Sequence, residues 1–131
     1  MQIFGIGTDI VNIKRMDKIL NKRGKKFINK IFSKREILYC EKKINSSSFY
    51  AKRFAAKEAF SKALGTGIRK GIKLKDIEVT NNKYGKPSIS LKKNLENYLR
   101  RKIKKSKYNI YLSLSDDRPW AQATVIISYN K

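Results

Sequence analysis

The chain has 131 residues, and its 32 lysines and arginines against 10 aspartates and glutamates give a formal net charge of +22. With no histidine and one cysteine, Cys40, the composition excludes an internal disulfide, a Cys/His nucleophile and a histidine-rich metal site. No stretch is apolar long enough to cross a bilayer, and no signal-peptide pattern is present. We therefore expect a cytoplasmic protein with one domain over residues 1–131 and no membrane partner.

So basic a surface attracts polyanions such as nucleic acid, anionic lipid, a phosphorylated cofactor or an acidic protein. Mutational drift toward A and T in a genome would produce the same crowd of lysine, asparagine and isoleucine. The scarce acidic residues are therefore more informative than the abundant basic ones. Two of them, Asp9 and Glu58, fall in the stretches that look most organised.

Residues 2–6 are typical of a strand, and Gly7 with Thr8 predicts a turn that leaves Asp9 near the strand end. A dinucleotide fold is excluded, because Ile10 stands where a third glycine is needed and no βαβ pattern follows. Asp9 has two interpretations, a metal ligand or the cap of a helix that begins near residues 11–12. Local sequence favours the cap.

The next segments have helical spacing. Ile13, Met16, Ile19 and Leu20 predict a helix that breaks near Gly24. Its other side is basic, with Lys14, Arg15, Lys18, Lys22 and Arg23. Residues 27–32 predict another helical turn. Ser33 and Glu36 form a capping-box pattern, which predicts a helix from Lys34 to about Lys43, followed by a polar loop at 45–47.

Residues 53–68, RFAAKEAFSKALGTGI, predict a helix that ends at Gly65 and Gly67. Winding the helix at ~100° per residue separates two faces. The apolar face holds Ala55, Ala56, Ala59, Phe60, Ala63 and Leu64, and the other holds Phe54, Lys57, Glu58, Ser61 and Lys62. A flat alanine stripe allows another element to pack closely, which would hold the Glu58 carboxylate and the Lys62 ammonium in place.

After the glycines the hydrophobic period changes from helix to strand. Residues 76–91 predict a hairpin, and Leu91, Leu95, Leu99 and Ile103 predict a helix packed by one stripe. Residues 108–115 predict a strand, residues 116–119 a turn, and a last strand has the inner face Ala121, Ala123, Val125 and Ile127. This order suits an α+β domain with a mainly antiparallel sheet packed against helices.

Glu58 and Lys62 alone are most simply an exposed ion pair, worth about 0.3–0.5 kcal/mol. Lys57, the following glycine turn and the absence of histidine favour a functional role. Two carboxylates together with phosphate oxygens suit magnesium. Lys86, Asp116 and Asp117 can each be explained as turn residues.

Taken together, four blocks carry a resemblance: GIGTDIV at 5–11, RFAAKEAFSKALGTGI at 53–68, GKP at 85–87 and SLSDDRPWAQATVI at 113–126. In order and spacing the chain resembles the holo-acyl-carrier-protein synthases, the short bacterial class of phosphopantetheinyl transferase. That resemblance implies a phosphopantetheinyl-transferase-like fold. It also implies magnesium-dependent transfer of 4'-phosphopantetheine from coenzyme A to a serine of apo acyl carrier protein, releasing 3',5'-ADP, in fatty acid biosynthesis.

The resemblance also implies roles for particular residues. Asp9 and Glu58 would bind the metal, and Glu58 and Lys62 would be catalytic. The coenzyme would be contacted by Arg53, Lys57, Lys62, Gly65, Gly67 and Lys86. Members of the family are homotrimers with sites between subunits. Because acyl carrier proteins are acidic, the basic helix with Lys14, Arg15, Lys18, Lys22 and Arg23 is the expected docking face, with Ile19 or Met16 as an apolar anchor.

One position departs from the pattern, since many members have a histidine where this chain has Asp116. A role of that histidine cannot be transferred, and the base that deprotonates the serine stays open between Glu58 and a carboxylate near Asp116. Two other functions compete with the transferase. The charge allows a small basic nucleic-acid-binding protein, although aromatics do not alternate with basic residues as stacking platforms would. A structural interaction module is the third hypothesis.

Overall fold

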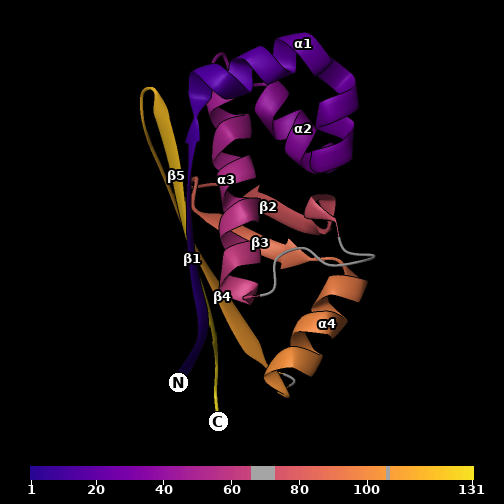
Figure 1. The fold of residues 1–131 in the computed structure, drawn as a ribbon, viewed down its shortest axis with the longest axis vertical. Helices are drawn as coiled ribbons and strands as arrows, with labels where there is room; N and C mark the ends of the chain where they lie inside the picture. Colours follow the sequence, from indigo (N-terminus) through magenta and orange to yellow (C-terminus); the bar gives the residue numbers. More distant parts are fainter. Residues whose placement is uncertain (66–72, 106) are drawn as a thin grey trace.

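A three-stranded antiparallel sheet and one long helix form the centre of the computed structural model, which describes residues 1–65, 73–105 and 107–131 (Figure 1). The sheet order is β1-β5-β4, and β2 and β3 form a separate antiparallel hairpin. In chain order the elements are β1 Gln2–Asn12, α1 Ile13–Ile31, α2 Lys34–Glu41, α3 Ser46–Leu64, the 3-10 helix η1 Leu74–Asp76, β2 Ile77–Asn81, β3 Pro87–Leu91, α4 Lys93–Ile103, β4 Tyr108–Asp117 and β5 Trp120–Tyr129.

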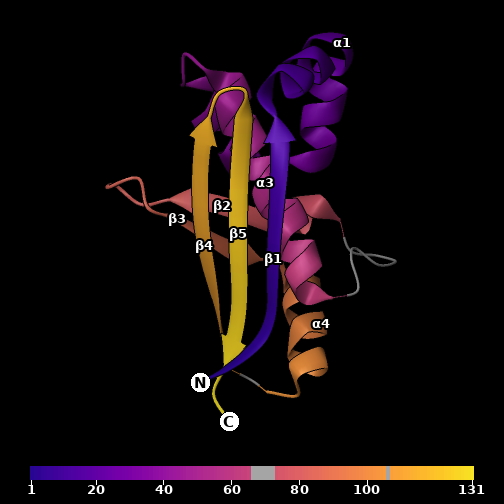
Figure 2. The same ribbon diagram turned by 60° about the vertical axis from the view of Figure 1, so that its left-hand side comes forward.

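Helix α3 runs along one face of the three-stranded sheet, with the β2–β3 hairpin and α4 on its other side (Figures 1 and 2). Helices α1 and α2 gather at one end of α3, and α4 lies at the opposite end (Figure 1). In the part of the chain that the structure describes, no helix covers the outer face of the sheet (Figure 2). The sheet therefore has one face in the core and one face open.

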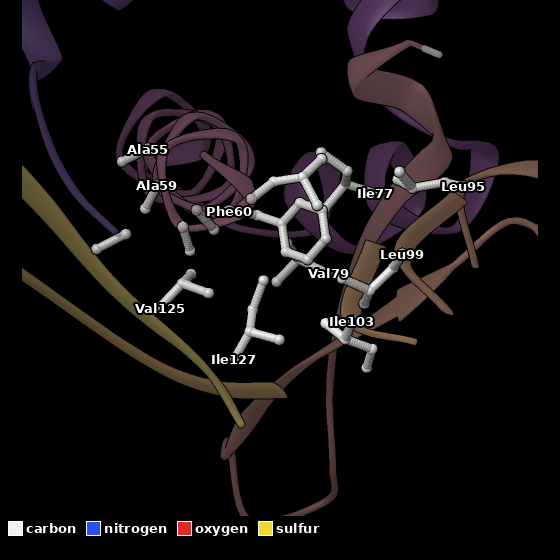
Figure 3. Packing of buried hydrophobic residues seen from close by; sticks show 14 residues of the cluster. Ala55, Ala59, Phe60, Ile77, Val79, Leu95, Leu99, Ile103, Val125 and Ile127 are labelled. Carbon is white, nitrogen blue, oxygen red and sulfur yellow. The ribbon is translucent and has the colours of Figure 1, made fainter. Parts of the chain in front are cut away.

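The main core lies between α3, the sheet, the hairpin and α4. Phe60 is fully buried and points into the space between Ile77, Val79 and Ile127 (Figure 3). The predicted inner face of the last strand is confirmed, because Ala121, Ala123, Val125 and Ile127 are all buried. The predicted stripe of α4 is also buried through Leu95, Leu99 and Ile103, whereas Leu91 belongs to β3.

Strand β1 lies directly against α3, and glycine makes this approach feasible. A Cβ atom on Gly7 would lie 1.9 Å from the carbonyl oxygen of Ala59, and one on Gly5 would lie 1.8 Å from that of Ala63. Any larger residue would push the strand and helix apart. The alanine stripe therefore receives a closely packed neighbour, as predicted, and that neighbour is β1.

Several predicted boundaries are confirmed. Ser33 and Glu36 form the capping box of α2, Gly65 ends α3 in the left-handed conformation, and the 76–91 hairpin is present. Gly24 interrupts α1 with a positive φ of 54°, so the predicted break exists, although the helix resumes and continues to Ile31. The predicted fold class, α+β with antiparallel sheets packed against helices, is confirmed.

Other local predictions were wrong. Gly7 and Thr8 form no turn, because β1 continues to Asn12 and Asp9 is paired with Ala123 of β5. Asn12, and not Asp9, caps α1: its side chain accepts a hydrogen bond from the backbone N–H of Arg15. The expected loop at 45–47 is mostly helical, since α3 begins at Ser46. Gly67 lies outside the described residues.

Candidate active site beside β1 and α3

Asp9, Glu58 and Lys62 come together where β1 crosses α3. Asp9 alternates with Gly5 and Gly7 on the inner face of β1, so its carboxylate points toward the helix. The Lys62 ammonium donates hydrogen bonds to the Asp9 carboxylate at 3.2 Å and to the backbone carbonyl of Thr8 at 2.9 Å. The Lys62 side chain stays 57% exposed and that of Asp9 18%, so both can meet a ligand from solvent.

Glu58 is half-buried, and its electrostatic surroundings are unusual for a helix surface. Burial raises the pKa of its carboxyl, the nearby Asp9 carboxylate raises it further, and Lys62 opposes both effects. The carboxylates of Asp9 and Glu58 are thus held close together, and the Lys62 side chain reaches from α3 to β1 beside them. Oxygen donors in this arrangement fit a hard divalent cation that takes its other ligands from water and phosphate.

Two carboxylates form an incomplete protein cage for a metal ion. Within residues 1–65, 73–105 and 107–131, no group of three or more histidine, cysteine, aspartate or glutamate side chains could hold an ion. Magnesium seldom needs such a group, because it keeps several waters and binds substrate phosphates. The donor set at Asp9 and Glu58 therefore fits magnesium bound together with a phosphorylated substrate.

The expectation that Lys57 and Ser61 share the open face of α3 was wrong. The Lys57 side chain is 0% exposed and its ammonium forms an ion pair with Glu36 at 2.8 Å, while Ser61 is buried and donates to the carbonyl of Lys57. An ammonium without exposed surface cannot touch a nucleotide unless the fold opens. Lys57 is therefore excluded from the set of coenzyme contacts in this conformation.

Arg53 and Lys86 lie apart from Asp9. Arg53 is 1% exposed, stacks its guanidinium over the Tyr39 ring at 4.1 Å and donates to the Asn81 side chain at the end of β2. Its Nε atom is buried without a hydrogen-bond partner within the described residues. Lys86 is exposed in the turn of the β2–β3 hairpin, whose tip lies beyond β4, the sheet edge opposite β1 (Figure 2).

The five basic residues predicted to form a docking face are all exposed on α1: Lys14, Arg15, Lys18, Lys22 and Arg23. Beside them is a groove of about 600 Å³ lined by Ile10, Val11, Asn12, Arg15, Met16, Ile19, Phe27, Phe54 and Trp120. Met16 is only 2% exposed and belongs to the core, so Ile19 is the better apolar contact. Phe54 precedes Glu58 by one helical turn on the same side of α3, so this end of the groove lies near Glu58.

Asp116 lies near the end of β4 and forms an ion pair with Lys52 of α3 at 3.1 Å. Register places it opposite Ala121 of β5, while Asp9 pairs with Ala123 on the other side of that strand. A whole strand thus separates the two aspartates. The structure shows no interaction between Asp116 and Glu58, so within this chain the Asp9–Glu58–Lys62 group stands without Asp116.

Sequence reasoning missed Glu36 as a partner of the central helix. The capping box showed that this carboxylate would bond to the backbone of its own helix, which it does at 2.8 Å from the N–H of Ser33. The same oxygen also takes the Lys57 ammonium from another helix. The only signal was an acidic residue in a chain that has few, and that signal does not identify the partner.

Comparison with known proteins places this arrangement in a family. Residues 5–123 match the model of the 4'-phosphopantetheinyl transferase superfamily, and the chain belongs to that superfamily. Among curated proteins, it is 46% identical over 127 residues to a holo-acyl-carrier-protein synthase of Pelagibacter ubique, covering 97% of this chain and 98% of the relative. The predicted resemblance is confirmed, and the chain is a transferase.

Solved structures agree with the fold and with the kind of ligand. The holo-acyl-carrier-protein synthase of Neisseria meningitidis superposes with a TM-score of 0.87 at 35% identity, covering 97% of this chain and 99% of that one. The synthase of Helicobacter pylori, solved in complex with coenzyme A, gives a TM-score of 0.81 at 35% identity and covers 94% and 99%. The nucleic-acid-binding hypothesis receives no support from these comparisons.

Proposed function

We propose that the chain transfers the 4'-phosphopantetheine group from coenzyme A to a serine hydroxyl of apo acyl carrier protein, releasing 3',5'-ADP. The observation that carries this function is the meeting of Asp9, Glu58 and Lys62 beside β1, in a chain that belongs to the phosphopantetheinyl transferase superfamily. Residues 1–131 act as a single transferase domain. Because coenzyme A and carrier proteins occur in the cytoplasm, the protein is expected there, and no described helix could span a membrane.

The site residues suit a phosphoryl-type transfer, which asks a protein mainly to position the groups and neutralise charge. Asp9 and Glu58 would hold magnesium, which supplies positive charge to the phosphate oxygens when bound. Lys62 can leave Asp9 and reach the phosphates, since its ammonium is largely exposed. Its flexible stem lets the ammonium stay close to those oxygens as their negative charge increases during the transfer.

Glu58 is the better candidate for the base that takes the serine proton. Its carboxylate lies beside Asp9 and Lys62, in the group that would hold the phosphates, so it is placed to accept the proton of an incoming serine. Asp116 is engaged with Lys52 and lies across a strand from Asp9. These contacts support Glu58 over Asp116 within one chain.

The carrier protein docks on the basic face of α1 and fills the neighbouring groove. The five exposed basic residues complement an acidic partner and speed its approach. The groove then offers Ile19 and Phe54 to apolar side chains of the carrier, next to the Asp9–Glu58 pair. A serine presented at this end of the groove would meet the phosphates without any large movement of α1.

Coenzyme sites are formed between subunits of a homotrimer. One chain presents Asp9, Glu58 and Lys62 at the β1 edge of the sheet, whereas the hairpin turn that holds Lys86 extends beyond the β4 edge (Figure 2). This separation supports a coenzyme that is shared across a subunit boundary. The open face of the sheet carries Ile6 at 59% exposure and Tyr111 at 50%, which suits burial against another copy. Sedimentation equilibrium tests the assembly, and a monomer that is active at assay concentration contradicts it.

Incubation of the chain with coenzyme A, magnesium and apo carrier protein tests the reaction. We expect the carrier to gain the mass of one phosphopantetheine group while 3',5'-ADP appears in equal amount. A carrier whose acceptor serine is replaced by alanine is the matched control and must stay unmodified. No mass gain with an authentic apo carrier overturns the proposed function.

A further inference from the structure

The Glu36 carboxylate joins three elements at the side of α3 that faces away from β1. One oxygen accepts from the backbone N–H of Ser33 and from the Lys57 ammonium, both at 2.8 Å, and the other accepts from the backbone N–H of Val79 at 2.9 Å. The Glu36 side chain is 0% exposed. Helix α2, helix α3 and strand β2 thus meet at one buried carboxylate.

The Lys57 ammonium is just as fully engaged. Besides Glu36 it donates to the backbone carbonyl of Leu74 at 3.1 Å and to that of Ile77, so each of its three protons has an acceptor. A buried charge with complete hydrogen bonding is costly to move, because any shift leaves a buried donor or acceptor unpaired. The pair therefore holds α3 at a fixed rotation against η1 and β2.

The opposite side of α3 is held by β1. Ala59, whose carbonyl lies against Gly7, is two residues and therefore about 200° around the helix from Lys57. Glu58 is about 100° from Lys57 and lies between these two contacts. The helix is thus held on both sides of the edge that carries Glu58 and Lys62, and neither contact touches the substrate side.

We propose that Lys57 and Glu36 are positioning residues: their buried ion pair sets the rotation of α3 and so places Glu58 and Lys62 opposite Asp9. Lys57 acts through the helix and makes no contact with coenzyme A. This proposal rests on the proposed function, which makes the Asp9–Glu58 pair the site of reaction. A misplacement of about 1 Å in such a site can cost about 100-fold in rate.

The test compares Lys57→Met, Glu36→Gln and the double variant. The glutamine keeps one of the two carboxylate oxygens, which can accept from the N–H of Ser33 or from that of Val79 but not from both. The double variant leaves no unpaired buried charge if a single variant fails to fold. Lys75→Met is the matched control, because Lys75 bonds the carbonyl of Asn29 at an exposed position. Folding is checked by circular dichroism, and kcat and the KM for coenzyme A are measured below the unfolding temperature.

Positioning predicts that both single variants lower kcat by about 10- to 100-fold with a KM for coenzyme A within about twofold of wild type. The double variant is expected to lose no more than either single variant, because both changes break the same bond. Binding of Mn²⁺ in the presence of coenzyme A is expected to weaken about tenfold, as for other residues that orient metal ligands. The Lys75→Met variant is expected to match wild type in each measurement.

Two results overturn the proposal. A KM raised tenfold or more in Lys57→Met alone would mean that Lys57 contacts the coenzyme, and an unchanged kcat in a less stable variant would mean a purely structural role. A crystal structure of the double variant judges the positioning without any activity: we expect the Glu58 carboxylate to shift relative to Asp9, and an unchanged position contradicts us. If wild type shows no transfer, the proposed function fails, and this crystallographic comparison still decides the positioning.

Discussion

Asn12 and Asp9 lie three positions apart in β1 and have separate physical roles. The Asn12 side chain caps α1, whereas the Asp9 carboxylate faces α3 and meets Lys62. Because the Lys62 side chain is 57% exposed, the ion pair contributes little to stability. The two residues can therefore be distinguished by what their loss changes.

Replacing Asp9 by asparagine is expected to abolish most magnesium-dependent transfer while leaving the free energy of unfolding within about 0.5 kcal/mol of wild type. Asn12→Ala is expected to lower stability by about 1 kcal/mol through the lost cap. Because Asn12 also lines the groove, its activity is compared at saturating carrier, where kcat is expected to stay close to that of wild type. Urea unfolding and carrier modification measure both quantities on the same samples. An Asp9→Asn variant as active as wild type would refute the metal role of Asp9.

Cys40 is a buried thiol whose reactivity should follow the fold. Burial raises its pKa from 9.0 to about 12, an effect that Arg53 partly opposes. At pH 9.0 the native thiol is therefore protonated, whereas the unfolded thiol would be half ionised. Only the thiolate is nucleophilic. We expect native protein to resist iodoacetamide at this pH and protein in guanidinium chloride to react at once. Equal rates by mass spectrometry would contradict the burial.

At the scale of secondary structure, the contact between β1 and α3 determines where the carboxylates lie. Gly5 and Gly7 allow the strand to rest on the carbonyl oxygens of Ala63 and Ala59. The next residue on the same face of β1 is Asp9, so the close contact between β1 and α3 also positions the Asp9 carboxylate. Separating the two elements would move Asp9 away from both Glu58 and Lys62.

Gly7→Ala is therefore expected to lower the free energy of unfolding by about 1–3 kcal/mol and to lower kcat as well. The added Cβ would meet the Ala59 carbonyl oxygen at 1.9 Å and force the strand outward. The neighbouring Thr8→Ala is the control, since it adds no atom against α3 and removes a hydroxyl that donates to the carbonyl of Ala123 and accepts from the Gln122 side chain. If Gly7→Ala is as stable and as active as the control, the close contact is not needed.

The helices and strands were largely predictable because their signals are local. The capping box at Ser33 and Glu36, the glycine stop at Gly65 and the alternation at Ala121–Ile127 each depend on neighbours in sequence. The site was less predictable. Local sequence favours a helix cap for Asp9, because the length of β1 depends on its pairing with β5, and only the resemblance indicates a metal ligand there. Local sequence likewise puts Lys57 on the open face of α3, because its partner lies 21 residues away.

At the scale of the molecule, the basic residues at the two ends have different expected uses. Helix α1 lies at one end of α3 beside the apolar groove, whereas α4 lies at the other end (Figure 1). Both helices expose basic side chains, including Arg15 on α1 and Arg101 on α4. Because net charge attracts an acidic partner from any side, only a comparison between these ends can reveal a specific docking face.

Arg15→Glu is expected to weaken carrier binding about tenfold at low salt and to reduce its salt dependence, with coenzyme A binding unchanged. Arg101→Glu changes the net charge equally and is expected to have an effect of less than about twofold. Titration calorimetry at two salt concentrations measures both. Equal weakening by the two variants would mean that the carrier is attracted by overall charge alone.

The central claim is that Asp9 and Glu58 bind magnesium in a transferase site. Its most direct test measures the mass of the carrier protein at a series of magnesium concentrations, for wild type and for Glu58→Gln. Wild type should modify the carrier only when magnesium is present. Glu58→Gln should fold normally and modify it at least about 100-fold more slowly at every magnesium concentration. A Glu58→Gln variant that transfers phosphopantetheine near the wild-type rate would contradict the assignment of the site.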